Sequence, residues 1–426
     1  MRVRLLAGLG LLPWLVVAGC DTGRIVTGDG NDAAPGAGGG TSTGGGQGGS
    51  GGGTGAGGAV TPGTGGAKGG AGGGSGGGQA GTTGAGGRAG SSGGAGAGGA
   101  TTGAGGSVGP GGAGGAAPPG PSGLPPAPGA ANVPKPSGTP GNITVLNWAG
   151  FSSAVSYTFD DANSSQISAY TQLQALGVPY TFYLWTGKTD ASNSVWATAV
   201  KDGHELGNHT QSHQSAGTTQ DINAATQFIM QHFGVQPWTM AAPNGAAVYT
   251  TLANGLFLIN RGVADNLVAP NDNTDPFTLP CYIPPTGATA TMFNAEVDSA
   301  HSAGRWRIIL VHGFTGGTDS AYQPVPLAEF ITSIKHTTSL GDMWAGTVVN
   351  VAAYWRGQKA FSQATTTMSG SDKTWTWKLP GNFPPGKYLR VTVPGGTVKQ
   401  NGAALTWDPH GYYEIALDAG SVTVSP

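Results

Sequence analysis

The chain has 426 residues, of which 81 are glycine and only 9% are charged, whereas an ordinary globular chain is about 7% glycine and 25% charged. A large part of the chain is therefore not an ordinary folded domain. The formal net charge of -2 and the lack of basic clusters exclude an electrostatic nucleic-acid binder, so no nucleic-acid partner is expected.

Residues 1–20 have the features of an export signal. Arg2 and Arg4 precede an apolar run of about 15 residues, a length typical of signal peptides and too short to span a membrane. The run ends in VAGC, which resembles a bacterial lipobox with Cys20 as the lipidated residue; the alternative is a plain secretory signal with a chance cysteine. We expect an exported protein that is anchored by lipid to the cell envelope or cell surface, at an inner or outer membrane that the sequence leaves undecided. Cys281, the other cysteine of the chain, would then have no disulfide partner.

Residues 21–141 are mainly Gly, Ala, Ser and Thr, with Pro enriched towards the end. This segment has no hydrophobic periodicity and few side chains that could form a core, so burial cannot offset the entropy of ordering it. We predict a disordered tether that is stiffer in its Pro-rich part.

Residues 142–356 alternate between two kinds of segment. Short apolar runs rich in β-branched and aromatic residues predict buried strands, and stretches with polar starts and Gly stops predict helices. Repeated strand–helix units of this length predict an α/β fold with a parallel sheet or barrel, in which chemistry collects at the carboxyl ends of the strands. The strands are expected at 154–159, 178–185, 204–209, 256–260, 306–312 and 344–350, and the helices at 164–177, 218–234, 291–304 and 324–341.

Three of these strand ends carry residues that can do chemistry. Asp160 and Asp161 follow the first strand, His209 and His213 follow the third, and His312 ends the strand WRIILVH. Each feature alone has a structural explanation: a turn or helix cap, a solvated histidine pair, or a core histidine. Their coincidence at one edge of a sheet favours a catalytic metal site, since two histidines and one carboxylate with open positions form a common catalytic set.

The motifs TFDD, GHELGNHTQSH and ILVH resemble those of the NodB-homology polysaccharide deacetylases, carbohydrate esterase family four. This resemblance implies a distorted (β/α) barrel of the NodB type over residues 142–356. It also implies a metal-dependent hydrolase that removes acetyl groups from an acetylated polysaccharide, as an amide of N-acetylglucosamine-type glycans or as an ester of xylan. We expect the protein to be a monomer.

The resemblance also assigns roles to individual residues. Asp160 would be the general base, Asp161 would bind the metal together with His209 and His213, and His312 would be the general acid. These roles suit the chemistry, because a bound metal ion polarises a carbonyl group and acidifies water while side chains move the protons. Zn²⁺ fits this ligand set best, and Co²⁺, Ni²⁺ or Mn²⁺ could also occupy it.

The sequence departs from the family pattern at the third motif, which is AAPNG here. Pro243 and Asn244 would contact the substrate, with the N–H of Asn244 as a donor to the oxyanion. Ala241 occupies the position where the family usually has an arginine that pairs with the catalytic aspartate. We predict that Arg261, after the next strand, replaces it; the alternative is a surface or capping role. The acidic partner of His312 is not identified.

Residues 357–426 contain short alternating segments separated by Gly, Pro and Asn-Gly turns, which predicts a small all-β domain. Its aromatic residues could form a carbohydrate-binding face or the core of the domain, and the core is the favoured interpretation; they are Trp375, Trp377, Trp407, Tyr412 and Tyr413.

Two functions remain open at this point. The first is a glycan deacetylase anchored to the membrane. The second is a non-catalytic glycan-binding lipoprotein that keeps the fold and the metal site, an interpretation favoured by the alanine at position 241.

Overall fold

The computed structural model describes residues 122–426. The expected signal peptide, Cys20 and most of the expected tether lie outside this range. No helix within these residues is long and apolar enough to cross a membrane.

The centre of the molecule is a parallel sheet in the order β6-β5-β4-β3-β2-β7, with β8 paired to the start of β2. Every residue of β2 is buried, as expected for a parallel sheet covered on both faces. The strands are β2 (Ser153–Asp160), β3 (Thr181–Leu184), β4 (Glu205–Asn208), β5 (Thr239–Ala241), β6 (Ile259–Arg261), β7 (Trp306–Val311) and β8 (Met343–Ala345).

The curled sheet is closed between its two edge strands by irregular chain. Leu279 forms a parallel bridge to Arg261 on β6, and Tyr282 forms a parallel bridge to Ile309 on β7. A segment that is not a regular strand therefore fills the gap between β6 and β7. The predicted α/β fold, a distorted barrel of the NodB type, is confirmed.

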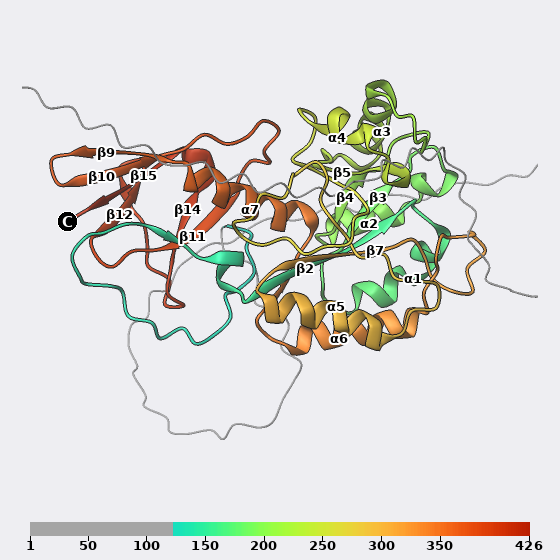
Figure 1. Cartoon of the computed structure of the whole chain (residues 1–426), viewed down its shortest axis with the longest axis horizontal. Coiled ribbons are helices and arrows are strands. Elements are labelled where there is room, and N and C mark those ends of the chain that lie inside the picture. Colours follow the sequence, from blue (N-terminus) through green and yellow to red (C-terminus); the bar gives the residue numbers. More distant parts are fainter. Residues whose placement is uncertain (1–121) are drawn as a thin grey trace, which may run out of the picture. The chain divides into compact units, whose positions relative to one another are not determined.

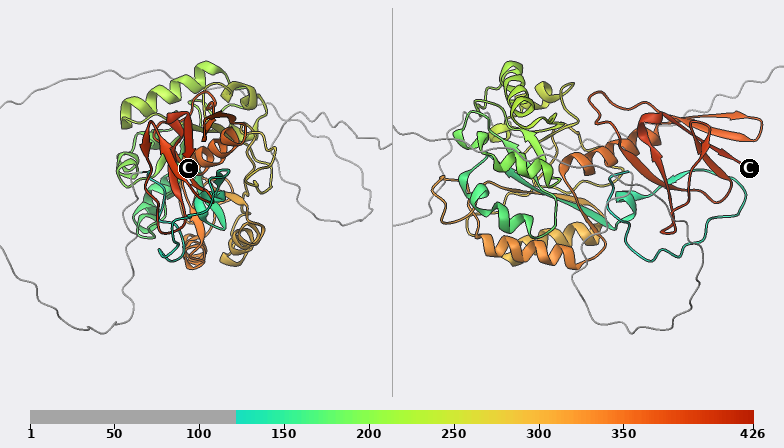
Figure 2. Two further views of the ribbon diagram at one scale, coloured as in Figure 1. Left: turned by 90° about the vertical axis from the view of Figure 1, so that its left-hand side faces the viewer. Right: turned by 180° about the vertical axis from the view of Figure 1, so that it is seen from behind.

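Helices pack around this sheet. α5 and α6 lie side by side along one flank, and α3 and α4 pack near β4 and β6 (Figures 1 and 2). The predicted signals of α3 act as expected, because Thr218 caps its start and Gly234 ends it with a left-handed backbone. The α-helices are α1 (Ser164–Gln174), α2 (Val195–Lys201), α3 (Thr219–Phe233), α4 (Val248–Ala253), α5 (Ala290–Ala303), α6 (Leu327–Ser339) and α7 (Val348–Ser362), and the 3₁₀ turns near the barrel are η1 (Asn147–Gly150), η2 (Thr189–Ser192) and η3 (Pro243–Gly245).

The strand expected at 344–350 is only partly correct. β8 stops at Ala345, the side chain of Thr347 then caps α7, and the N–H of Val349 donates to the carboxylate of Glu205. A short apolar run does not distinguish a strand from a buried helix. Here Thr347 caps the start of a helix, so the run from Val348 onwards is helical. α7 continues to Ser362, past the expected start of the β domain at residue 357.

The C-terminal part forms two antiparallel sheets, in the orders β13-β12-β15-β10-β9 and β1-β11-β14. Trp375, Trp377, Tyr412 and Tyr413 are each at most 7% exposed. These aromatic rings therefore belong to a core and do not form an exposed platform. The strands are β1 (Thr144–Val145), β9 (Thr365–Ser369), β10 (Asp372–Thr376), β11 (Tyr388–Thr392), β12 (Thr397–Gln400), β13 (Ala403–Ala404), β14 (Tyr413–Ala416) and β15 (Ser421–Ser425), with the turn η4 (Leu417–Ala419).

Residues 122–141, the last part of the expected tether, lie against these sheets. The N–H of Val133 donates to the carbonyl of Pro409. The buried guanidinium of Arg390 donates to the carbonyl of Pro125. Prolines reduce the entropy that such a segment loses on ordering, and its free carbonyl groups accept hydrogen bonds. The β domain is therefore built from chain on both sides of the barrel in sequence.

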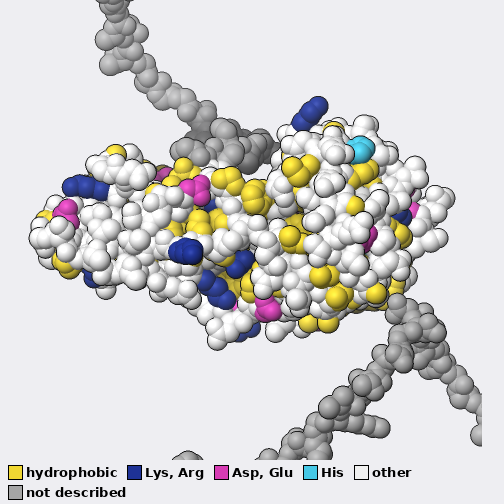
Figure 3. Space-filling model, turned by 90° about the horizontal axis from the view of Figure 1, so that it is seen from above, with side chains coloured by type: hydrophobic (Ala, Val, Ile, Leu, Met, Phe, Trp, Pro, Cys, Tyr) yellow, Lys and Arg dark blue, Asp and Glu magenta, His cyan; other side chains and the backbone are white. Residues whose placement is uncertain are grey.

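The surface agrees with the low content of charged residues. On the face drawn in Figure 3, charged side chains are sparse and hydrophobic side chains are dispersed.

His204, one of the three histidines of the GHELGNHTQSH motif, has a structural role at the start of β4. Its Nδ1 accepts the N–H of Tyr180, and its Nε2 donates to the side-chain oxygen of Gln174. Burial lowers the pKa of His204 to about 4. The folded protein therefore holds the ring of His204 in its neutral form at pH 7.

We expect His204 to make the domain acid-sensitive. Between pH 6.5 and about 4 the unfolded chain binds a proton that the folded chain does not, so stability falls as the pH falls, by about 1.4 kcal/mol per pH unit. The free energy of unfolding can be measured by denaturant titration at pH 7 and pH 5, with protein freed of metal by a chelator. From pH 7 to pH 5, it should fall by about 2 kcal/mol more in the wild type than in His204→Gln. The exposed His232→Gln is the control, and equal losses in all three proteins would contradict the assignment.

Candidate active site and metal centre

The carboxyl ends of the parallel strands bring the predicted site residues together. Asp160 is the last residue of β2 and Asp161 follows it, His209 follows β4, Arg261 ends β6, and His312 follows β7. Ends of parallel strands meet at one edge of a sheet, and the contacts described below join four of these five side chains directly.

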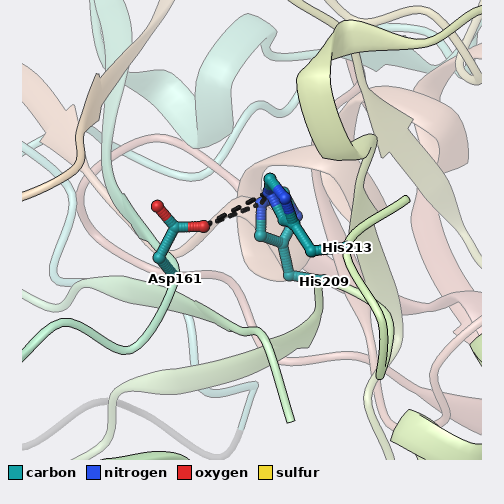
Figure 4. Close-up of side chains that lie close together, drawn as sticks. All are labelled: Asp161, His209 and His213. Carbon is teal, nitrogen blue, oxygen red and sulfur yellow. Dashed lines mark hydrogen bonds and ion pairs between the residues drawn. The ribbon is translucent and has the colours of Figure 1, made fainter. Parts of the chain in front are cut away.

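Three side-chain atoms form a nearly equilateral triangle (Figure 4). The Oδ1 atom of Asp161 lies 3.5 Å from Nε2 of His209 and 3.4 Å from Nε2 of His213. The two Nε2 atoms are 3.2 Å apart. A tetrahedral zinc ion with ligands at about 2.0–2.2 Å requires its ligand atoms to be roughly 3.3–3.5 Å apart. Asp161, His209 and His213 thus fit one face of a tetrahedral metal site.

Hydrogen bonds and stacking hold both histidines in this orientation. Nδ1 of His209 donates to the carbonyl of Ala241 at 2.9 Å, which leaves Nε2 free to bind a metal. The ring of His213 stacks on Trp185, with centroids 4.6 Å apart, and its backbone N–H donates to Thr210. The fold therefore holds the two Nε2 atoms towards each other and towards the carboxylate of Asp161.

Several residues around this triangle have a left-handed backbone that non-glycine residues rarely adopt. The φ angles are 77° at Asp161, 60° at Thr210, 54° at His213 and 54° at Asn244. Such conformations cost about 1–3 kcal/mol each and gather at functional sites. The fold holds these side chains in the site at a cost in free energy.

Asp160 forms a buried ion pair with Arg261. A guanidinium N–H donates to Oδ2 of Asp160, and both side chains are at most 3% exposed. Oδ2 also lies 3.6 Å from Nε2 of His209. Ala241 and Arg261 are direct neighbours in the register of β5 and β6. The guanidinium thus comes from the strand beside the position where the family pattern has its arginine.

Charges inside the site set its protonation. Burial raises the pKa of Asp161, but a hydrogen bond and the nearby imidazole charges lower it more, so the net pKa lies well below the ordinary value. Burial lowers the pKa of His209, and the two aspartates raise it to a net increase. Burial and His209 lower the pKa of His213 to about 4. His213 is therefore neutral at pH 7, the state that binds a metal.

His312 is positioned by its backbone. Its carbonyl accepts hydrogen bonds from the side chains of Asn163 at 2.6 Å and Gln166 at 2.7 Å. Its ring meets Tyr322 edge-on at 5.2 Å, and burial lowers the pKa of the imidazole. Its Nδ1 has no hydrogen-bond partner among residues 122–426.

The acids of the loop after β6 do not supply that partner. Asp265 pairs with Arg307 on β7. Asp272 and Asp275 accept backbone N–H groups of their own loop. These three acids therefore do not pair with His312 in the described part of the chain.

Pro243 and Asn244 form the turn η3 directly after β5. In this turn Gly245 donates to the carbonyl of Ala242, and Ala246 donates to that of Pro243. These two bonds do not use the N–H of Asn244. The side chain of Asn244 donates to Ser215 at 3.0 Å.

Three further residues near the site were not predicted from the sequence: Trp185, Lys188 and Asn163. Trp185 packs on His213, and Lys188 donates to Asn163, which in turn donates to the carbonyl of His312. Trp185 and Lys188 follow β3 as the aspartates follow β2. Their place after a parallel strand was the available signal.

Comparison with curated proteins finds no match, whereas solved structures resemble the chain at low identity. The peptidoglycan deacetylase PdaC from Bacillus subtilis is 21% identical, with a TM-score of 0.33 over 47% of this chain and 89% of that chain. The Xyl-CE4 domain of a multidomain xylanase from the hindgut metagenome of Trinervitermes trinervoides is 19% identical, with a TM-score of 0.34 over 47% and 89%. A family 4 acetyl xylan esterase from Clostridium thermocellum, in complex with cobalt, is 21% identical, with a TM-score of 0.34 over 46% and 89%.

Residues 151–256 match the family model described as polysaccharide deacetylase. The matched segment contains both aspartates of the site and both histidines of the triangle. This part of the chain, which holds the first strands of the barrel and the triangle, is therefore similar to polysaccharide deacetylases.

Proposed function

We propose that this protein is a metal-dependent hydrolase that removes acetyl groups from a polysaccharide outside the cytoplasm. One observation carries the proposal: the triangle of Asp161, His209 and His213 lies beside a second aspartate that is paired with a buried arginine. A ligand set with open positions next to a separate carboxylate is what metal-assisted hydrolysis needs.

Asp161, His209 and His213 are the proposed ligands of the divalent metal. Zn²⁺ suits two imidazoles and one carboxylate, and Co²⁺, Ni²⁺ and Mn²⁺ are the alternatives. A metal bound there would polarise the acetyl carbonyl and lower the pKa of a water molecule.

Asp160 is the proposed general base. Arg261 occupies its Oδ2 atom, while Oδ1 is buried and has no partner in residues 122–426. Oδ1 is therefore the atom free to accept a proton from the attacking water. The guanidinium balances the charge of the carboxylate and fixes its orientation, two conditions for efficient general-base catalysis.

The remaining steps belong to His312 and the turn η3. His312 would donate a proton to the leaving amine or alcohol. The N–H of Asn244, beside Pro243, would donate a hydrogen bond to the oxyanion that develops from the acetyl carbonyl. The substrate is an N-acetylglucosamine-type glycan or acetylated xylan, because both present an acetyl carbonyl to the same groups.

The case for a non-catalytic glycan-binding protein rested on Ala241. The ion pair between Arg261 and Asp160 removes that reason, because the carboxylate has a cation even though position 241 does not supply it.

The purified protein should release acetate from chitooligosaccharides, peptidoglycan or acetylxylan. A chelator should abolish the release, and added Zn²⁺ should restore it. Asp160→Asn should lower the rate by about 10²–10⁴-fold, because it removes the base, and should retain the metal. A His209→Ala, His213→Ala double variant should lose both metal and activity.

His232→Ala, an exposed histidine on α3, serves as the control and should keep both. Acetate release that survives chelation, or an unchanged metal content in the double variant as measured by elemental analysis, would exclude the proposed metal site.

A second experiment tests whether Arg261 orients Asp160 and whether an arginine at position 241 can replace it. Arg261→Ala should lower kcat by an order of magnitude or more, since a misoriented base loses much of its effect. It should also cost about 3–5 kcal/mol of stability, because the Asp160 charge stays buried without a partner. Adding Ala241→Arg, from the neighbouring register position, should restore part of kcat and of the melting temperature.

Arg261→Lys is the matched control, because it keeps the charge but not the planar fork. Steady-state kinetics separate the outcomes. Wild-type kcat in Arg261→Ala would contradict the orienting role, and a loss confined to KM would mean that Arg261 binds substrate instead.

We also propose export and lipid anchoring through Cys20, on the strength of the lipobox-like VAGC alone. The polysaccharide would then meet the enzyme at the cell envelope. Cys20→Ser should move the protein from the membrane fraction to the soluble fraction and remove radiolabelled palmitate. Label that persists in the variant would contradict the assignment.

A further inference from the structure

A cavity of about 640 Å³ lies where η1 and α7 meet the C-terminal sheets. It shares no residue with the candidate active site. Its volume falls in the range of roughly 300–1,000 Å³ that is usual for small-molecule sites. Its walls come from four segments that are distant in sequence: 142–147, Asn271, the end of α7, and the strands β9 and β10.

The floor of this cavity contains a buried amide that is only half satisfied. Gln358 on α7 is 5% exposed. Its Nε2 donates to Oδ1 of Asn147 at 2.7 Å and to Oδ1 of Asn271 at 3.2 Å. Its Oε1 is buried and has no partner within the described residues. Leaving a buried acceptor unpaired costs about 1–3 kcal/mol, so a donor that reaches this oxygen would stabilise the protein.

The rim of the cavity offers the complementary donors. Asn147 and Asn271 use their side-chain oxygens to accept from Gln358, and Asn142 uses its oxygen to accept from Lys373 at 2.7 Å. Among residues 122–426, no hydrogen bond uses the NH₂ groups of these three asparagines. All three asparagines are exposed.

Apolar side chains line the same cavity beside the amides; they are Ile143, Val145, Phe361, Ala364 and Trp375. A sugar ring also combines apolar and polar surfaces, because its C–H faces are apolar and the hydroxyl groups around its edge donate and accept hydrogen bonds. One hydroxyl would donate to Oε1 of Gln358, and others would accept from the asparagines.

The charges of the lining residues further restrict the class of ligand that the cavity can bind. No carboxylate and no histidine is among the lining residues, so a divalent cation has no ligand set here. Lys373 is the one cation, and it already binds Asn142 while lying over Trp375 at 5.1 Å. An anionic ligand would gain little from it. We propose that this cavity binds a sugar residue of a neutral glycan.

Such a site would act independently of catalysis. A polysaccharide chain held there would stay at a high effective concentration near the barrel. The consequence concerns long substrates, because a short soluble acetyl ester reaches the active site without this contact.

The test is calorimetric titration of the full-length protein with xylotriose, tri-N-acetylchitotriose and the charged trimer trigalacturonate. The Asp160→Asn background prevents turnover of the acetylated probe. We expect binding of at least one neutral trimer and at least tenfold weaker binding in Gln358→Leu and in Asn271→Ala. Asn271 is exposed, so its variant decides the question if Gln358→Leu fails to fold.

Gln363→Leu, an exposed glutamine just beyond the same helix, is the matched control and should bind like the parent. Acetate release from a small ester, measured in the Asp160-containing protein, should be unchanged in all three variants. The proposal is overturned if no neutral trimer binds, if trigalacturonate binds more tightly, or if Asn271→Ala binds like the parent, which would leave a water-filled cavity only.

Discussion

The ion pair between Asp160 and Arg261 is the constraint on which the site depends. Both side chains are removed from water, and moving two charges out of water costs several kcal/mol per ion unless the geometry of the pair is good. That geometry requires the ends of β2 and β6 to be fixed across the barrel. The bridge between Arg261 and Leu279 holds the end of β6. The contacts that close the sheet therefore also fix the guanidinium that orients Asp160, the proposed base.

The adjacent aspartates Asp160 and Asp161 have different partners because β2 ends between them. Asp160 is still part of β2 and faces the buried guanidinium. Asp161 has a φ of 77°, and its carboxylate turns to the two imidazoles instead. Two neighbouring residues in a regular strand would point to opposite faces. The left-handed turn lets both carboxylates approach His209, while only that of Asp161 also lies close to His213.

Motifs and periodicity predicted the barrel and the triangle, because strand ends and a histidine pair are local features. They were not sufficient for contacts between distant segments. Arg261 could be proposed, but its neighbourhood to Ala241 depends on register, which the sequence does not state. The apolar run after Trp344 was predicted as a strand and becomes a helix, because Thr347 and the remote Glu205 cap it. Residues 122–141 have the composition of a tether, and only the folded β domain gives their backbone groups partners.

Helix α7 connects the base of the barrel to the amide-lined cavity. At its start, the buried carboxylate of Glu205 accepts from the N–H of Val349 and from Thr181 on β3. A carboxylate at a helix N-terminus is stabilised by the exposed N–H groups there, although burial raises the pKa of Glu205. Ten residues of α-helix rise about 15 Å, and the same helix then presents Gln358 and Phe361 to the cavity. Since α7 is buried along much of its length, a rigid element sets the spacing between the strands that carry the candidate active site and the proposed sugar site. A glycan that contacts both sites would therefore have to span a constant distance. A flexible linker between two domains would instead let that distance vary.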